Sequence, residues 1–138
     1  IARMKNIQII LILFISTLSL SAADKTKKIH QNLNPKKAKT LIESYDKAKE
    51  KLMIIDVRTR EEYEQGHLSK AKLIDFFDDA FEKKISALDK KSPYLIHCHS
   101  GGRSMKAFKL MKTLGFEKVF HLDGGILAWK SSGNRLKN

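Results

Sequence analysis

Cysteine is nearly absent from this chain: Cys98 is the only one among 138 residues. A single cysteine cannot form an internal disulfide, so the small domains that are held together by disulfides are excluded. The sequence has no internal repeat and no low-complexity linker, which excludes solenoids and linker-joined arrays. It also has no zinc-finger or RNP signature, so no motif indicates a nucleic-acid partner. The length suits one small domain with a single core and is too short for two.

Acidic residues are few relative to basic ones. Lysine and arginine number 27 against 15 aspartate and glutamate, which gives a formal net charge of +12. A basic balance can favour nucleic acid, an anionic membrane surface or small anionic substrates. The lysines are scattered among acidic residues instead of forming one block. We therefore expect mainly a solvated basic surface, with a secondary role in attracting a small anion.

The longest apolar run lies at the start of the chain. Arg3 and Lys5 precede an apolar stretch from Ile7 to Leu20, and small residues follow at positions 21–23. This order predicts a secretory signal peptide over 1–23, a mature chain that starts at Asp24, and a periplasmic or secreted location. An uncleaved anchor is the alternative, but the run is shorter than the roughly 20 residues that a spanning helix needs. We expect no stable membrane insertion after cleavage.

Apolar runs alternate with amphipathic stretches along the rest of the chain. Residues 24–33 read as a mobile start with a possible edge strand, 34–130 as the folded domain, and 131–138 as a flexible, frayed tail. Expected strands cover 52–57, 71–77, 94–96 and 119–122. Expected helices follow Asn34, cover 61–64, 81–88 and 126–130, and begin at Ser104. Strands that alternate with helices predict an α/β fold, a three-layer parallel β-sheet with helices on both faces.

Cys98 lies where the expected strand 94–96 gives way to a helix. The N-terminus of a helix has free N–H groups and a positive dipole end, so it favours anions. Gly101 and Gly102 can adopt positive φ angles that curl successive amides inward, and Arg103 adds a permanent positive charge. These features favour thiolate over thiol, which predicts that Cys98 has a low pKa and acts as a nucleophile. The alternative is a buried structural cysteine.

The stretch Cys98-His99-Ser100-Gly101-Gly102-Arg103-Ser104 resembles the Cys-x-x-Gly-x-Arg-Ser active-site loop of the rhodanese family. Two further segments resemble the family's terminal signatures: residues 54–58 followed by 61–63 and 66–68, and residues 122–126 with Trp129. The resemblance covers about Asn34 to Trp129. One departure is Ser69-Lys70-Ala71, where the family usually has Pro-Gly-Ala.

The resemblance implies a rhodanese-like sulfurtransferase that works without metal or cofactor. Cys98 would take sulfane sulfur from thiosulfate or a similar anionic donor as a persulfide and pass it to a thiol or cyanide acceptor. The loop residues that would bind the substrate are His99, Ser100, Gly101, Gly102, Arg103 and Ser104. A sulfur carrier that hands its persulfide to a partner protein is a second possibility. A cysteine-dependent phosphatase is a third, but such enzymes have five residues between cysteine and arginine, and this loop has four.

Several neighbours of Cys98 also have side chains that could do chemistry. Strand alternation predicts that His97 points away from the pocket, while His99 either contacts substrate or only fills space at the pocket mouth. Three consecutive residues rarely converge on one ion, so we expect no metal site at 97–99. Asp56 and Arg58 are expected to form an ion-pair network with Glu61 or Glu62 that fixes the loop. We assign no function to the remaining histidines at positions 30, 67 and 121.

Overall fold

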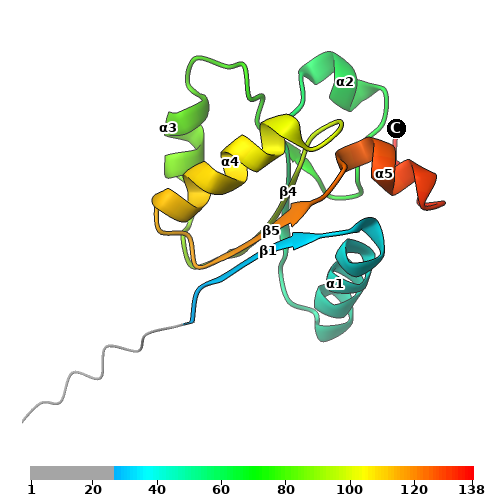
Figure 1. The fold of residues 1–138 in the computed structure, drawn as a ribbon, viewed down its shortest axis with the longest axis horizontal. Helices are drawn as coiled ribbons and strands as arrows, with labels where there is room; N and C mark the ends of the chain where they lie inside the picture. Colours follow the sequence, from blue (N-terminus) through cyan, green and yellow to red (C-terminus); the bar gives the residue numbers. More distant parts are fainter. Residues whose placement is uncertain (1–26) are drawn as a thin grey trace, which may run out of the picture.

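Residues 27–138 are described by a computed structural model, and its centre is a five-stranded parallel sheet (Figure 1). The strands follow the spatial order β1-β5-β4-β2-β3, so β4 lies in the middle. Their bounds are β1 Ile29–Leu33, β2 Met53–Asp56, β3 Lys72–Leu73, β4 Pro93–His97 and β5 Lys118–Leu122. The helices are α1 Pro35–Ala48, α2 Arg60–Glu64, α3 Phe81–Ser86, α4 Gly102–Thr113 and α5 Gly125–Ser131.

The helices cover both faces of the sheet because successive strand residues point to opposite sides. Ile55 and Ile96 face one core together with apolar residues of α3 and α4. Ile54 and Leu95, their neighbours in sequence, face a second core with residues of α1 and α5. Figure 1 shows α3 and α4 on one side of the strands and α1 on the other. The predicted three-layer α/β fold is therefore confirmed.

The starts of two helices follow from their capping residues. Asn34 Oδ1 accepts the Lys37 N–H at 2.9 Å, and Pro35 occupies the first position of α1. Thr59 and Glu62 form a capping box at α2, in which each side chain accepts the other residue's backbone N–H. Helix α4 begins at Gly102, two residues before the expected start at Ser104. Arg103 therefore lies in the first turn of a helix instead of in the preceding loop.

The expected strand over 71–77 is wrong in length, because β3 comprises only Lys72 and Leu73. The backbone N–H groups of Ile74 and Phe76 still donate to the carbonyls of Asp56 and Val57, at 2.9 and 3.1 Å. Asp75 then turns the chain, since its carboxylate accepts the Phe77 N–H at 2.9 Å. The apolar side chains at 74 and 76 pack on the core from an irregular segment, which periodicity alone does not distinguish from a strand.

The expected frayed tail at 131–138 is also corrected by the structure. Lys137 pairs with His67 through two backbone hydrogen bonds of 2.8 Å, and the Arg135 carbonyl accepts the Trp129 indole N–H at 3.1 Å. Leu136 packs against the second core. The sequence does not predict that Leu136 packs on the domain, because a single leucine in a polar segment has no hydrophobic periodicity.

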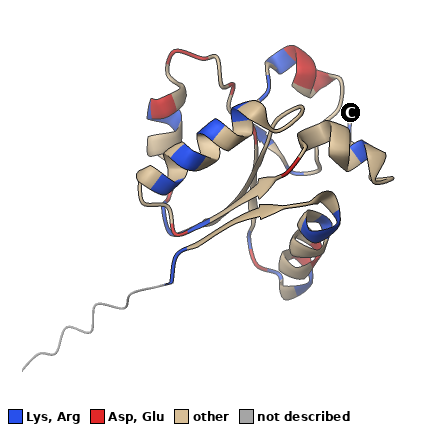
Figure 2. Cartoon of the chain, in the orientation of Figure 1, with Lys and Arg blue, Asp and Glu red and all other residues tan. Residues whose placement is uncertain are grey.

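The possible edge strand near the N-terminus is confirmed as β1, which pairs in parallel with β5. The proposed signal peptide lies outside the described residues. Within residues 27–138, no helix has both the length and the apolar character needed to span a membrane. Figure 2 shows basic residues distributed over several elements, with acidic residues between them on α2 and α3.

Candidate active site

Cys98 immediately follows β4, at the carboxyl edge of the sheet. In the parallel register, Asp56 of β2 lies opposite His97 of β4, so the chain segments that follow both strands emerge side by side. Parallel α/β sheets bind ligands outside this edge. Topology alone therefore places Cys98 and Arg58 in the region where chemistry is expected.

The Cys98 sulfur is held by polar groups although the residue is only 1% exposed. The Gly101 N–H donates to Sγ at 3.1 Å, and the Ser104 hydroxyl lies 3.2 Å from Sγ. Burial raises the pKa of the thiol, but hydrogen bonds from the Ser104 hydroxyl and from the amides of Ser104, Gly101 and Ser100 outweigh it and lower the pKa. This environment differs from that of an inert apolar cysteine, which would have a raised pKa.

Only one of the two loop glycines uses the conformational freedom predicted for both. Gly101 has φ +106°, whereas Gly102 is an ordinary residue of the first helical turn. A Cβ on Gly102 would meet nothing within 4 Å. The inward turn of the amides therefore depends on Gly101.

The other side of the loop is fixed by α5. The N–H groups of Ile126 and Leu127 donate to the carbonyls of Cys98 and His99, both at 3.0 Å. Gly125 lies so close to these carbonyls that a Cβ there would sit 2.5 Å from the Cys98 oxygen. Two loop carbonyls are thus satisfied by α5, while the Gly101 amide faces the sulfur.

Arg103 forms a bidentate ion pair with Glu62, with Nη1 to Oε2 at 2.7 Å and Nη2 to Oε1 at 2.8 Å. This Arg103 contact holds the pKa of Glu62 at about 2, despite the opposing effect of burial. The guanidinium also lies 5.5 Å from the ring centre of Phe77, which is 67% exposed. Arg103 thus joins α4 to α2, and the described residues show no hydrogen bond from it to the sulfur.

The expected network of Asp56 and Arg58 with Glu61 or Glu62 is wrong in its partners. Arg58 pairs with Asp56 itself, Nη2 to Oδ2 at 2.7 Å, and donates to the Gly66 carbonyl at 2.7 Å. Both residues are buried, and Glu62 is engaged by Arg103. Sequence proximity favoured the i to i+4 partner, but the fold brings the more distant arginine to Glu62.

His97 points away from the sulfur, as strand alternation predicts. It is fully buried, its Nδ1 lies 3.3 Å from the Cys98 carbonyl, and its Nε2 lies 3.8 Å from Asp56 Oδ2. Burial lowers the pKa of His97 even though the Asp56 carboxylate opposes the change. His97 is therefore neutral near pH 7 and contributes packing at the base of the loop.

Two residues, His121 and Asn32, connect to the sulfur through Ser104 and were missed by the sequence reasoning. His121 Nε2 lies 2.7 Å from Ser104 Oγ, and His121 Nδ1 lies 2.7 Å from Asn32 Oδ1. These side chains come from β5, α4 and β1, which are far apart in the sequence. No local motif joins these three side chains. The pairing of β1 with β5 could have indicated the contact between His121 and Asn32, but not the one between His121 and Ser104.

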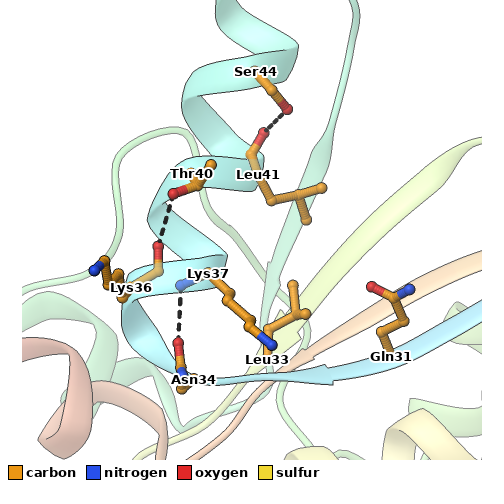
Figure 3. Close-up of a pocket in the computed structure, with 8 residues that line it drawn as sticks. All are labelled: Gln31, Leu33, Asn34, Lys36, Lys37, Thr40, Leu41 and Ser44. Atoms are coloured by element: carbon orange, nitrogen blue, oxygen red, sulfur yellow. Dashed lines mark hydrogen bonds between the residues drawn. The ribbon is translucent and has the colours of Figure 1, made fainter.

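The remaining candidate residues and cavities carry less chemistry. His99 and Ser100 have exposed side chains at the outer surface of the loop. Among residues 27–138, no group of three potential metal ligands comes together. A surface groove between β1 and the start of α1 shares no lining residue with the loop (Figure 3). In that groove the Asn34, Thr40 and Ser44 side chains already bond to α1 backbone groups.

Comparison with known proteins places the chain in a family. The rhodanese-like domain family matches residues 20–132, which is most of the chain. A crystal structure of a rhodanese-like domain protein from Staphylococcus aureus superimposes with a TM-score of 0.62 at 29% identity, covering 78% of this chain and 99% of that one. The chain belongs to the rhodanese-like domain family.

Individual relatives differ in what their names state. Thiosulfate sulfurtransferase 18 of Arabidopsis thaliana is 29% identical over 123 residues, 80% of this chain and 85% of that protein. YrkF of Bacillus subtilis (strain 168), named as a proposed sulfur carrier, is 39% identical over 58% of this chain and 42% of its own length. A tRNA uridine(34) hydroxylase of Cytophaga hutchinsonii is 33% identical over 80% of this chain but 35% of its own. Family membership thus supports sulfur transfer in general.

Proposed function

We propose that this protein is a thiosulfate sulfurtransferase that carries sulfane sulfur as a persulfide on Cys98. One observation carries the proposal: a buried cysteine sulfur receives the Gly101 N–H at 3.1 Å and lies 3.2 Å from the Ser104 hydroxyl. Donors aimed at a sulfur stabilise negative charge on it, whether it is a thiolate or the inner atom of a persulfide.

The reaction has two steps that divide at a covalent intermediate. In the first, the Cys98 thiolate attacks the outer sulfur of thiosulfate, a new S–S bond forms, the old S–S bond breaks, and sulfite leaves with the electron pair. In the second, cyanide or a thiolate attacks the outer sulfur of the persulfide. The Cys98 thiolate departs, and the product is thiocyanate or a new persulfide. No external oxidant or reductant is consumed, because the sulfane sulfur is exchanged between nucleophiles.

The size of the site favours sulfur over phosphate as the transferred group. Four residues separate Cys98 from Arg103, and Arg103 is held by Glu62 at 2.7 and 2.8 Å. A phosphatase needs a wider ring whose arginine forks the phosphate oxygens. Here the guanidinium fork is already occupied by a carboxylate, and Cys98 is 1% exposed, which suits the terminal atom of a small donor.

A sulfur carrier is the second candidate, and the proposed role of the relative YrkF supports it. The same persulfide would form, but a partner protein would accept the sulfur. The exposed Phe77 beside Arg103 is an apolar contact point close to the loop. Steady-state turnover with thiosulfate and cyanide separates the two: an enzyme turns over many times, and a carrier stops after one equivalent.

We further propose that the protein is exported to the periplasm or secreted. The supporting feature is the basic, apolar and small-residue order of 1–23. Mature protein from its native host should begin at Asp24 and appear in the soluble exported fraction. An N-terminal sequence that includes the apolar run, or recovery only with membranes, would contradict this location.

The experiment that tests the proposed function is an assay for thiocyanate formation over a grid of thiosulfate and cyanide concentrations. A covalent intermediate predicts parallel, ping-pong reciprocal plots. Aryl phosphate hydrolysis is measured on the same preparation. Intersecting plots would contradict the persulfide intermediate, and useful phosphatase turnover without sulfur transfer would replace the proposal.

A further inference from the structure

A chain of hydrogen bonds runs from the Cys98 sulfur through the fold to the far edge of the sheet. Ser104 Oγ lies 3.2 Å from the Cys98 Sγ and 2.7 Å from His121 Nε2. His121 Nδ1 lies 2.7 Å from Asn32 Oδ1. Ser104 and His121 are at most 1% exposed, whereas Asn32 is exposed on β1. The chain thus connects the nucleophile to solvent through two buried groups that can move a proton.

The Ser104 hydroxyl has one proton, which can point to one acceptor at a time: His121 Nε2 at 2.7 Å, the Cys98 sulfur at 3.2 Å or the Gly101 carbonyl at 3.3 Å. When His121 is neutral and its Nδ1–H donates to Asn32, the bare Nε2 accepts the Ser104 proton, and none remains for the sulfur. When His121 is protonated, Nε2–H donates to Ser104 Oγ, and the hydroxyl proton is free to donate to the Cys98 thiolate. In both states Asn32 Oδ1 accepts from Nδ1–H. The direction of the Ser104 hydrogen bond therefore depends on the charge of His121.

We infer that His121 holds the proton of the Cys98 thiol, received through Ser104, while the sulfur is anionic. The S–H bond breaks as the proton passes to Ser104 Oγ, and the original Ser104 proton passes to His121 Nε2. The products are a thiolate and an imidazolium, and the total charge is unchanged. This inference deepens the proposed function, since it concerns the same nucleophile. His121 is a positioning residue that acts through Ser104, because it does not touch the sulfur.

The surroundings of His121 are consistent with such a coupled pair. Burial lowers the pKa of His121, while the Asp123 carboxylate just after β5 and a hydrogen bond with the Gly101 backbone oppose this effect. Its two ring nitrogens contact Ser104 of α4 and the neutral amide of Asn32 on β1, and Cys98 lies beyond Ser104. His97 lies on the opposite face of β4, because Ile96 is the register partner of His121, and the two histidines interact only by charge. An isolated buried imidazolium is costly, and a nearby thiolate offsets that cost. The histidine is therefore expected to be charged mainly when the sulfur is.

The test is the pH dependence of Cys98 alkylation by iodoacetamide, which reports the thiolate fraction without any sulfur donor. His121→Gln can still hydrogen-bond to Ser104 but cannot hold the proton. We expect the apparent thiol pKa to rise by about one unit, which lowers the alkylation rate near neutral pH roughly tenfold and leaves the alkaline plateau unchanged. His30→Gln is the matched control, because His30 Nε2 lies 2.7 Å from the Phe116 carbonyl and takes no part in the hydrogen bonds that join Cys98 to Asn32. The alkylation profile of His30→Gln should match that of wild type.

A wild-type measurement covers the case in which His121→Gln fails to fold. The His121 imidazole is followed by NMR before and after Cys98 is alkylated, which removes the sulfur's charge. We expect the pKa of His121 to fall on alkylation. The inference would be overturned if wild type and His121→Gln had the same alkylation profile, or if the pKa of His121 were the same before and after Cys98 is alkylated. A shifted profile in a protein that never gains sulfur from thiosulfate would sustain the inference and refute the proposed function.

Discussion

At the scale of single residues, Cys98 combines two environments that are usually separate. Its side chain belongs to the core that α3 and α4 build on one sheet face, yet its sulfur accepts a backbone N–H and lies beside a hydroxyl. An apolar surrounding strengthens each of these interactions, because charge is poorly screened there. The thiolate is thereby stabilised without a permanent cation bonded to it.

The two loop glycines give a first prediction. Gly101→Ala places a Cβ at φ +106° and should cost about 1 to 2 kcal/mol of stability while weakening persulfide formation. Gly102→Ala is the matched control, because its Cβ would be in open space at the start of a helix. Chemical unfolding and single-turnover sulfur transfer measure both effects. Equal losses in the two variants would show that the loop does not depend on the left-handed conformation of Gly101.

At the scale of elements, the loop is shaped by helices that lie far apart in the sequence. Helix α2 contributes Glu62, which caps its own helix and also forms an ion pair with Arg103 in the first turn of α4. Helix α5 contributes two N–H groups that take the loop carbonyls. The loop geometry is therefore a property of three packed helices.

The Glu62–Arg103 pair predicts a pH-dependent stability difference. The folded-state pKa of Glu62, about 2, lies below the ordinary value of 4.5, so its contribution is present above pH 4.5 and is lost as the pH falls toward 2. Glu62→Gln should lower the free energy of unfolding near neutral pH by on the order of 1 to 3 kcal/mol, after allowance for partial exposure. The difference from wild type should disappear near pH 2. A difference that is constant over this range would contradict the ion pair's role.

Arg103→Lys tests whether the bidentate geometry matters for sulfur transfer. Lysine keeps the charge but cannot bond both Glu62 oxygens in a planar fork. We expect a clear fall in the rate of persulfide formation, with the overall fold retained. If Arg103 acted only by charge, Arg103→Lys would keep the wild-type rate. Stopped-flow measurement of sulfite release distinguishes these outcomes.

Gly125→Ala tests the support from α5. A Cβ there would sit 2.5 Å from the Cys98 carbonyl oxygen and 2.6 Å from that of His99, so the helix must retreat from the loop. We expect a loss of about 2 to 4 kcal/mol in stability and slower sulfur transfer. Gly133→Ala is the control for positive φ alone, since its Cβ would meet nothing within 4 Å. Similar losses in the two variants would argue against a role for α5 in shaping the loop.

At the scale of the whole molecule, the sequence predicts the sheet well because its strands are short apolar runs between amphipathic helices. Ile54 and Ile55 signal a strand buried on both faces, and the layer order follows from that. The contacts of Arg103 and His121 were not predictable, because each joins side chains more than 15 residues apart. The tail and the segment after β3 were misjudged because neither has the periodicity on which such predictions depend.

The most direct test of the account is the mass of the intact protein after incubation with thiosulfate. We predict that wild-type protein gains the mass of one sulfur atom, loses it on addition of cyanide, and carries the added atom on Cys98. Cys98→Ser should gain nothing while its thermal unfolding remains cooperative. Wild-type protein that never carries the extra sulfur, or Cys98→Ser that still transfers sulfur, would contradict a persulfide on Cys98.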